Sequence, residues 1–149
     1  MTEKDFNISI IKPVQFSLAT SKIAVENATD ARAKEFAGFE LAETTVLLSV
    51  LKDLETILPE MDETARTAFN EIESQEVGAE FDRLYIKAQL QTHRLLRDLT
   101  EEYIKQAPGD HLIVDELQTR HIAALALVMF KEHVAITERL SKELSGESE

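Results

Sequence analysis

The chain has 149 residues, of which 44% are hydrophobic and 30% charged, a composition typical of a soluble globular domain long enough to bury a core. Its 28 acidic and 16 basic residues give a formal net charge of −12. Such a surface repels phosphate backbones and anionic lipid, which argues against nucleic acid and membrane-surface partners. The absence of cysteine excludes disulfides, thiolate metal sites and cysteine nucleophiles.

Neither a signal peptide nor a membrane span is predicted. The N-terminal residues have no apolar stretch of signal-peptide length behind a basic start, so we expect a cytoplasmic protein as written. A periplasmic location applies if a leader was removed before this numbering. The most apolar run, from Ile122 to Phe130, is too short to cross a bilayer, and no membrane insertion is expected.

Two long helices are predicted in the first part of the chain. Residues 1–12 are expected to form a loosely ordered lead-in. Pro13 suits the first turn of a helix, where its missing N–H removes no hydrogen bond, so the first helix is placed at 13–28. Asp30 is a typical N-cap for a second helix over about 31–58, which ends before a proline.

A short helix is predicted in the connection that follows. Asp62 can cap this helix, which extends to about Glu73. Gly78 weakens helix locally, and a third long helix is placed after it, over about 79–106.

The last long helix follows a break in the chain at Pro108 and Gly109. Asp110 can cap this helix, which is expected to end at about Leu144 ahead of a solvated tail, residues 145–149. The sequence therefore predicts an all-α fold, a four-helix bundle formed as a single domain by the residues between the lead-in and the tail. The short extra helix lies in the connection between the second and third long helices.

Apolar side chains recur in steps of three and four along the helices, which predicts the buried stripes of a bundle. The last helix carries Ile122, Ala126, Met129, His133, Ile136 and Leu140. The second helix carries Phe36, Glu40, Glu43, Leu47, Val50, Leu54 and Ile57. The third long helix carries Phe81, Tyr85, Ala88, Thr92, Leu95 and Leu99. Because buried polar groups are costly unless satisfied, the histidine and the two glutamates each need a structural partner or a function.

Three blocks of the chain resemble a known family. They are Ser21-Lys-Ile-Ala-Val-Glu-Asn-Ala28 with Lys34-Glu-Phe-Ala37, Phe81-Asp-Arg-Leu-Tyr85 with Gln89 and His93, and Leu127-Val-Met-Phe-Lys-Glu-His133 with Leu140. In this order they resemble the bacterial ferritin-like proteins grouped as domain of unknown function 4142. The resemblance covers most of residues 20–140. It implies a ferritin-like bundle with no settled activity.

The chain departs from that family pattern at two places. Thr44 stands where the family usually has a histidine. The first helix offers only Gln15 and Ser17 where the family usually has a glutamate.

The histidine spacing argues against a di-iron centre. Carboxylate-bridged di-iron sites in bundles use Glu-x-x-His pairs, in which both side chains point at one pair of metal ions. The residues three positions before the four histidines are Leu90, Pro108, Gln118 and Phe130. A di-iron oxidase or an iron store is therefore not expected.

A mononuclear site is the metal hypothesis that remains, with Glu43, His93 and His133 as its weak candidate ligands. If residues 59–78 cross over as in ferritins, the second and last long helices run antiparallel, and Glu43 and His133 lie at similar heights. Such a set can hold zinc, copper or iron. The favoured interpretation is a buried His–Glu hydrogen bond that fixes helix register, completed by Tyr85 or Gln89. The two other histidines, His111 and His121, are expected at the surface.

The leading functional hypothesis is a non-enzymatic helical bundle that acts in protein association or in a stress response. No catalytic or cofactor-binding residue is assigned, because the chain has no P-loop, dinucleotide fingerprint, nucleophile elbow or His-Glu-x-x-His pair. The alternative is a mononuclear metal-binding or metal-dependent redox protein. A protein partner and a homo-oligomer both stay open.

Overall fold

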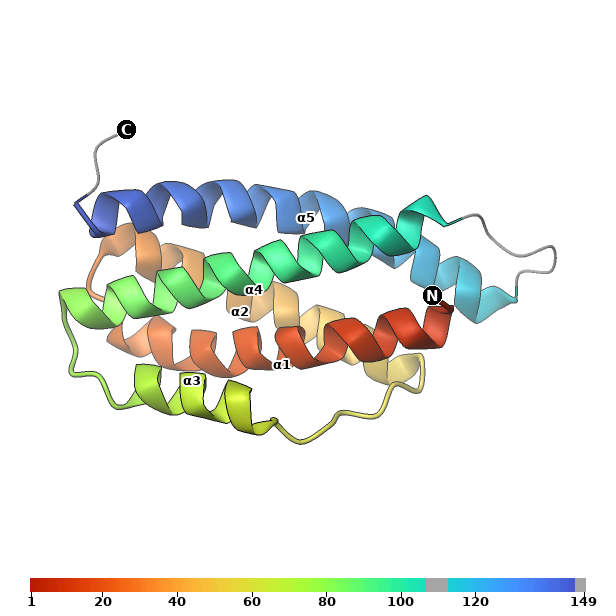
Figure 1. The fold of residues 1–149 in the computed structure, drawn as a ribbon, viewed down its shortest axis with the longest axis horizontal. Coiled ribbons are helices and arrows are strands. Elements are labelled where there is room, and N and C mark those ends of the chain that lie inside the picture. Colours follow the sequence, from red (N-terminus) through yellow and green to blue (C-terminus); the bar gives the residue numbers. More distant parts are fainter. Residues whose placement is uncertain (107–112, 147–149) are drawn as a thin grey trace.

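The computed structural model describes residues 1–106 and 113–146, and these residues form helices and their connections without any strand (Figure 1). The helices are α1 (Glu3–Asn27), α2 (Ala31–Asp53), α3 (Glu63–Glu73), α4 (Ala79–Lys105) and α5 (Val114–Leu144). The predicted all-α bundle, with one short helix between the second and third long helices, is confirmed.

The four long helices lie side by side along the long axis of the molecule (Figure 1). α1 and α2 run in opposite directions, as do α4 and α5. The connection after α2 returns along the outside of α1 through α3, so α4 runs in the same direction as α2. As a result α5 is antiparallel to α2. This is the condition under which Glu43 and His133 are expected to lie at similar heights along the bundle.

The first helix begins at Glu3, ten residues before the predicted start at Pro13. Thr2 and Asp5 form a capping box that starts it, and Phe6, Ile10 and Ile11 are buried in the core. The expected lead-in is therefore part of α1. Pro13 lies inside this helix, where its ring removes one backbone hydrogen bond without ending the helix.

The second helix ends at Asp53, earlier than the predicted residue 58. Glu55 has a φ of 62°, a left-handed conformation that the helix cannot continue through. The amide of Thr56 closes the end by donating to the carbonyl of Leu51 at 2.9 Å. Ile57, which was expected on the buried stripe, therefore lies outside the helix and is 86% exposed.

The last helix begins at Val114 and ends at the predicted Leu144. Its predicted cap, Asp110, lies outside the described residues, as do Pro108, Gly109, His111 and the end of the tail.

The core consists of two hydrophobic clusters with a polar layer between them. One cluster contains Val14, Leu48, Leu96 and Phe130 with further residues from the same four helices. The other contains Ala24, Ala37, Ile86 and Leu140 with further residues that include Ile72 of α3. Between these positions the four long helices bury polar side chains, which are Ser17, Thr20 and Ser21 on α1, Glu40 and Thr44 on α2, Gln89, Thr92 and His93 on α4, and His133 and Thr137 on α5.

The predicted stripes of α2 and α5 lie partly in the core and partly at its edge, beside a groove between these two helices. Glu43, Leu47 and Val50 are half-buried and line the groove together with Ile122 and Met129. The fully buried positions of α2 include only Phe36 and Glu40 from the predicted stripe, together with Ala33, Ala37, Thr44, Leu48 and Leu51. Because seven residues are slightly less than two full turns of a straight helix, a stripe that repeats every seven residues rotates slowly around the helix axis. The predicted stripe of α2 therefore coincides with the buried face only in the first turns.

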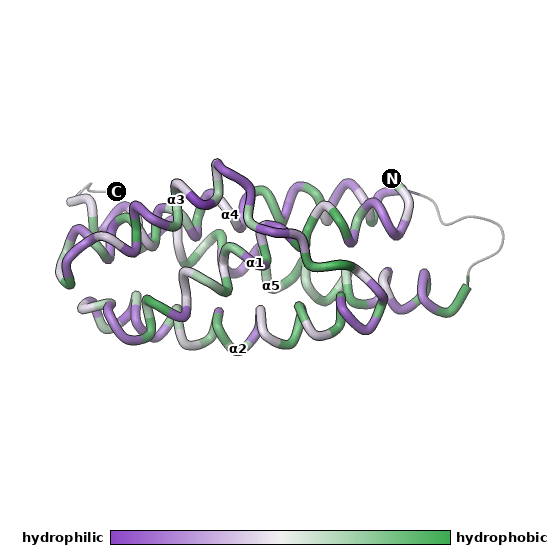
Figure 2. Tube along the Cα trace, turned by 90° about the horizontal axis from the view of Figure 1, so that it is seen from below, coloured by the Kyte–Doolittle hydropathy of each residue, from purple (hydrophilic) through white to green (hydrophobic). Residues whose placement is uncertain are grey.

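Hydrophilic and hydrophobic residues alternate along every long helix (Figure 2). In the described part of the chain, none of the helices has the length and apolarity needed to cross a membrane.

Candidate metal centre

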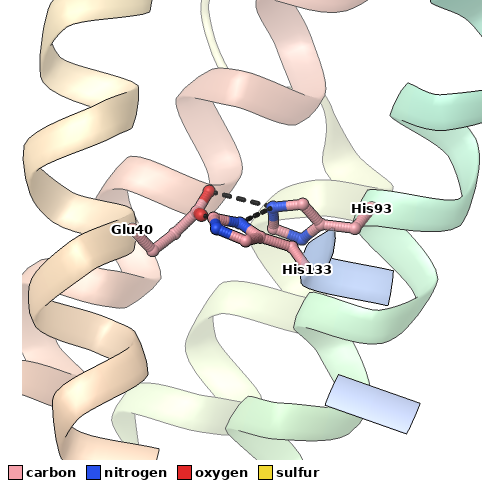
Figure 3. Close-up of side chains that lie close together, drawn as sticks. All are labelled: Glu40, His93 and His133. Atoms are coloured by element: carbon pink, nitrogen blue, oxygen red, sulfur yellow. Dashed lines mark hydrogen bonds and ion pairs between the residues drawn. The ribbon is translucent and has the colours of Figure 1, made fainter. Parts of the chain in front are cut away.

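Three ionisable side chains from three helices meet in the polar layer. Glu40 comes from α2, His93 from α4 and His133 from α5, and all three are buried (Figure 3). His93 Nε2 lies 3.1 Å from Glu40 Oε1, and His133 Nδ1 lies 2.7 Å from Glu40 Oε2. The two ring nitrogens are 3.3 Å apart. One carboxylate and two imidazoles therefore face a common point.

The backbone of α4 fixes the tautomer of His93. Its Nδ1 lies 2.8 Å from the carbonyl oxygen of Gln89, one turn earlier on the same helix. A carbonyl oxygen can only accept, so Nδ1 carries the proton in this hydrogen bond. In the neutral ring Nε2 then has no proton, and its lone pair points toward Glu40 and His133.

His133 is held between two carboxylates. Its Nδ1 faces Glu40, and its Nε2 lies 3.0 Å from Glu43 Oε2. Burial lowers the pKa of His133, but the hydrogen bond that His133 donates to Glu40 and the negative charges of Glu40 and Glu43 outweigh burial and raise the pKa above its usual value. When it is protonated, this ring donates from Nδ1 to Glu40 and from Nε2 to Glu43.

Glu40 is the carboxylate at the centre of the cluster. Ser17 Oγ donates to Glu40 Oε1 at 2.7 Å, and Oε1 also faces His93. Burial raises the pKa of Glu40, but the hydrogen bond from protonated His133 and the positive charge of that ring hold the pKa well below its usual range. Glu40 is therefore ionised, and each of its oxygens has a protein partner.

Hydrogen bonds from Ser17, Thr20 and Gln89 surround the Glu40 carboxylate. Ser17 Oγ lies 2.9 Å from Gln89 Oε1, and Gln89 Nε2 donates to Thr20 Oγ1 at 3.0 Å. Because a hydroxyl has a single proton, Ser17 donates either to Glu40 or to Gln89 at any instant. This chain of contacts links α1 to the ligand cluster, although α1 contributes no ionisable group to it.

Glu43 occupies the outer side of the cluster. Its side chain is 35% exposed, and it contacts His133 at the ring nitrogen that points away from Glu40 and His93. Burial raises the pKa of Glu43, and the positive charge of His133 partly opposes this effect.

The structure brings together two of the three residues singled out from the sequence. His93 and His133 face each other, whereas Glu43 lies behind His133 and the carboxylate between the two rings is Glu40. Glu40 and Glu43 are less than one helical turn apart, so an argument from height along the helix could not distinguish them. The buried phase of α2, with Phe36, Glu40 and Thr44 in steps of four, is the signal that points to Glu40.

The remaining polar candidates have simpler environments. Gln89 joins the network as expected, but Tyr85 pairs with Ser21 at 2.8 Å rather than with a histidine. Burial raises the pKa of Tyr85 far above its usual range, so this phenol stays neutral. His121 is exposed, as expected, and His111 is not among the described residues.

Two positions where the family pattern usually has a glutamate and a histidine carry hydroxyls in this chain, Ser17 and Thr44. Ser17 hydrogen-bonds the Glu40 carboxylate, and Thr44 Oγ1 donates to the backbone carbonyl of Glu40 at 2.6 Å. Both hydroxyls support Glu40. Among the described residues, Glu40, His93 and His133 are the group in this layer whose ligand atoms lie close enough together to hold an ion.

A groove between α2 and α5 leads to the cluster. It is a cavity of about 520 Å³ that reaches Glu40, Glu43, Thr44 and His133 at one end. The remaining walls are apolar, and they include Val46, Leu47, Val50, Ile122, Leu125 and Met129. His93 does not line the groove.

Comparison with known proteins identifies one relationship. A family model described as "Domain of unknown function (DUF4142)" matches residues 2–140. No curated protein and no solved structure was found to match the chain.

Proposed function

This chain belongs to the DUF4142 family, whose description assigns no function, and we propose from the site itself that the protein binds a single divalent transition-metal ion. Glu40, His93 and His133 are the ligands. His93 binds through Nε2 and His133 through Nδ1.

The observation that carries this proposal is the way the two rings are anchored. Metal-binding histidines usually donate their outer N–H to a carbonyl or a carboxylate, which orients the ring and fixes its tautomer. His93 has the Gln89 carbonyl at its outer nitrogen, and His133 has the Glu43 carboxylate. Both inner nitrogens are thereby directed at Glu40.

The spacing of the donor atoms supports the same ion. Nitrogen ligands bind zinc at about 2.0–2.1 Å, so tetrahedral ligand atoms lie roughly 3.3 Å apart. The separations of 3.1 Å and 3.3 Å at His93 Nε2 are close to this value. The 2.7 Å contact between Glu40 and His133 is shorter, as suits a hydrogen bond that metal binding would replace.

The charge balance also favours a divalent cation. With His133 protonated, one imidazolium faces the carboxylates of Glu40 and Glu43 and leaves one net negative charge. A divalent ion with two neutral imidazoles balances both carboxylates. Because uncompensated charge inside a protein is costly, the loaded centre is electrostatically better matched than the empty one.

Two imidazoles and one carboxylate are borderline ligands that suit Zn²⁺, Fe²⁺ and Cu²⁺. With three protein ligands, a four-coordinate or larger shell keeps at least one position open for an exogenous molecule. The protein-association role expected from the sequence, and the ferritin-like detail of the bundle, stay predictions.

Metal stoichiometry after dialysis against Zn²⁺, or against Fe²⁺ without oxygen, tests this proposal. We expect about one tightly held ion per chain, and its loss in His133→Ala and in His93→Gln. The matched control is His121→Ala, which removes an exposed histidine from the same helix, α5, and should leave the stoichiometry unchanged.

Circular dichroism establishes that each variant is folded. A folded wild-type protein that retains no stoichiometric metal would contradict the proposal. Equal loss of metal from His121→Ala and His133→Ala would contradict it as well.

A further inference from the structure

The groove between α2 and α5 has polar and apolar parts that are separated along its length. Its ionisable groups, Glu40, Glu43 and His133, lie at one end. From Glu43 to Val50 along α2 the groove continues for roughly 10 Å at the usual helical rise. Over this distance its walls are apolar. A ligand that fills the groove therefore needs one polar end and an extended apolar body.

The charge at the polar end of the groove determines whether a cationic or an anionic ligand is favoured. The groove is lined by two carboxylates and one imidazole, and by no lysine or arginine among the described residues. The whole chain carries a formal charge of −12, which adds to the repulsion of anions. A cationic end is favoured over an anionic one.

Glu43 is the group that such a cation would contact. It is half-buried, and only its Oε2 has a partner, His133, among the described residues. A cation at Oε1 can pair with this half-buried carboxylate through a charge-assisted hydrogen bond.

We propose that the groove between α2 and α5 binds an amphiphilic organic amine. Its ammonium group contacts the Glu43 carboxylate, and its hydrocarbon chain lies against Val46, Val50, Leu125 and Met129. The cavity of about 520 Å³ is within the usual range for small-molecule sites, roughly 300–1,000 Å³. This proposal goes beyond metal binding and does not require a bound ion.

This inference can be tested independently of the metal by isothermal titration calorimetry. The full chain is first treated with a chelator and is then titrated with n-octylamine. We expect octylamine to bind at least tenfold more tightly than octanoate. Removing methylenes should weaken binding about fourfold each, because each buried CH₂ contributes a constant increment. Glu43→Gln should weaken octylamine binding at least fivefold and leave octanol binding unchanged.

Two valine-to-lysine variants provide a matched pair. Val46→Lys places an ammonium on the groove wall, three residues from Glu43 on the same helix. Because this ammonium can pair with Glu43 and repels a second cation, the substitution should abolish octylamine binding. Val128→Lys makes the same change outside the groove, at a similarly exposed site (68% against 64%), and should leave the affinity within twofold.

Undetectable octylamine binding, equal affinity for octylamine and octanoate, or unaltered affinity in Val46→Lys would each overturn the inference. None of these results depends on whether the protein holds a metal ion, so failure here is distinguishable from failure of the proposed metal centre.

Discussion

His133 has a different carboxylate at each of its ring nitrogens. The nitrogen that faces Glu40 is the one proposed to bind metal, whereas the one that faces Glu43 anchors the ring. A proton and a metal ion therefore compete for the same atom, Nδ1. The same geometry therefore bears both on the stability of the metal-free protein and on the proposed binding of an ion.

The ion pair between Glu40 and His133 predicts a stability optimum at mildly acidic pH in the metal-free protein. The pKa of His133 is raised from 6.5, so its contribution is fully present below about pH 6.5 and is lost as the pH rises through the folded value. The pKa of Glu40 is lowered from 4.5, so its contribution is present above about pH 4.5 and is lost as the pH falls.

Urea denaturation in the presence of a chelator, between pH 4 and pH 9, measures this dependence. We expect the free energy of unfolding to decrease from about pH 6.5 upward, and this decrease to disappear in His133→Ala. A wild-type profile that rises through this range would contradict the assigned ion pair.

At the scale of single elements, the N-terminal part of α1 supports the core to an extent that the sequence did not reveal. Phe6 is 1% exposed and stacks on Tyr103 of α4 with ring centroids 4.3 Å apart. Phe6→Ala should therefore reduce the free energy of unfolding by about 3–5 kcal/mol. Ile8→Ala, two residues away and 58% exposed, should change it by less than about 0.5 kcal/mol.

Chemical denaturation of the two variants measures the difference. Similar, small effects for both would mean that the first turns of α1 are not packed against α4.

The helix interiors could be predicted from periodicity, but several helix ends could not. Thr2 caps α1 eleven residues before Pro13. Glu55 ends α2 in a left-handed backbone conformation that a glutamate would not be predicted to adopt. Face assignment was also incomplete, because Leu95 lies on the predicted stripe of α4 and is 50% exposed. Spacing indicates which residues share a face, whereas packing against the neighbouring helices decides how far that face is buried.

For the molecule as a whole, the connection through α3 positions the centre. Because it makes α5 antiparallel to α2, Glu40 and His133 meet at the same level of the bundle (Figures 1 and 3). The sequence places His133 on a buried stripe with Glu43 as its facing carboxylate, and Glu43 does contact His133, but the carboxylate between the two rings is Glu40. Glu40 and Glu43 are less than one helical turn apart on α2 and point in different directions. The central carboxylate depends on rotation of α2, which is a property of the assembled fold.

The three proposed ligands lie on three different helices. We therefore expect metal binding to stabilise the whole fold. The unfolded chain has no such site, so a divalent ion at about one hundred times its dissociation constant should add about 2.7 kcal/mol to the free energy of unfolding. Thermal denaturation with and without Zn²⁺ measures the effect. We expect a higher Tm for the wild-type protein and no shift for His133→Ala, whereas equal shifts in both would place the ion elsewhere.

The most direct test of the central claim is an anomalous difference map from crystals of the protein grown with Zn²⁺. The predicted result is one strong peak per chain in the polar layer, about 2.0–2.2 Å from Nε2 of His93, Nδ1 of His133 and a carboxylate oxygen of Glu40. The contradicting result is a map with no peak between α2, α4 and α5 at a Zn²⁺ concentration that gives peaks at surface sites.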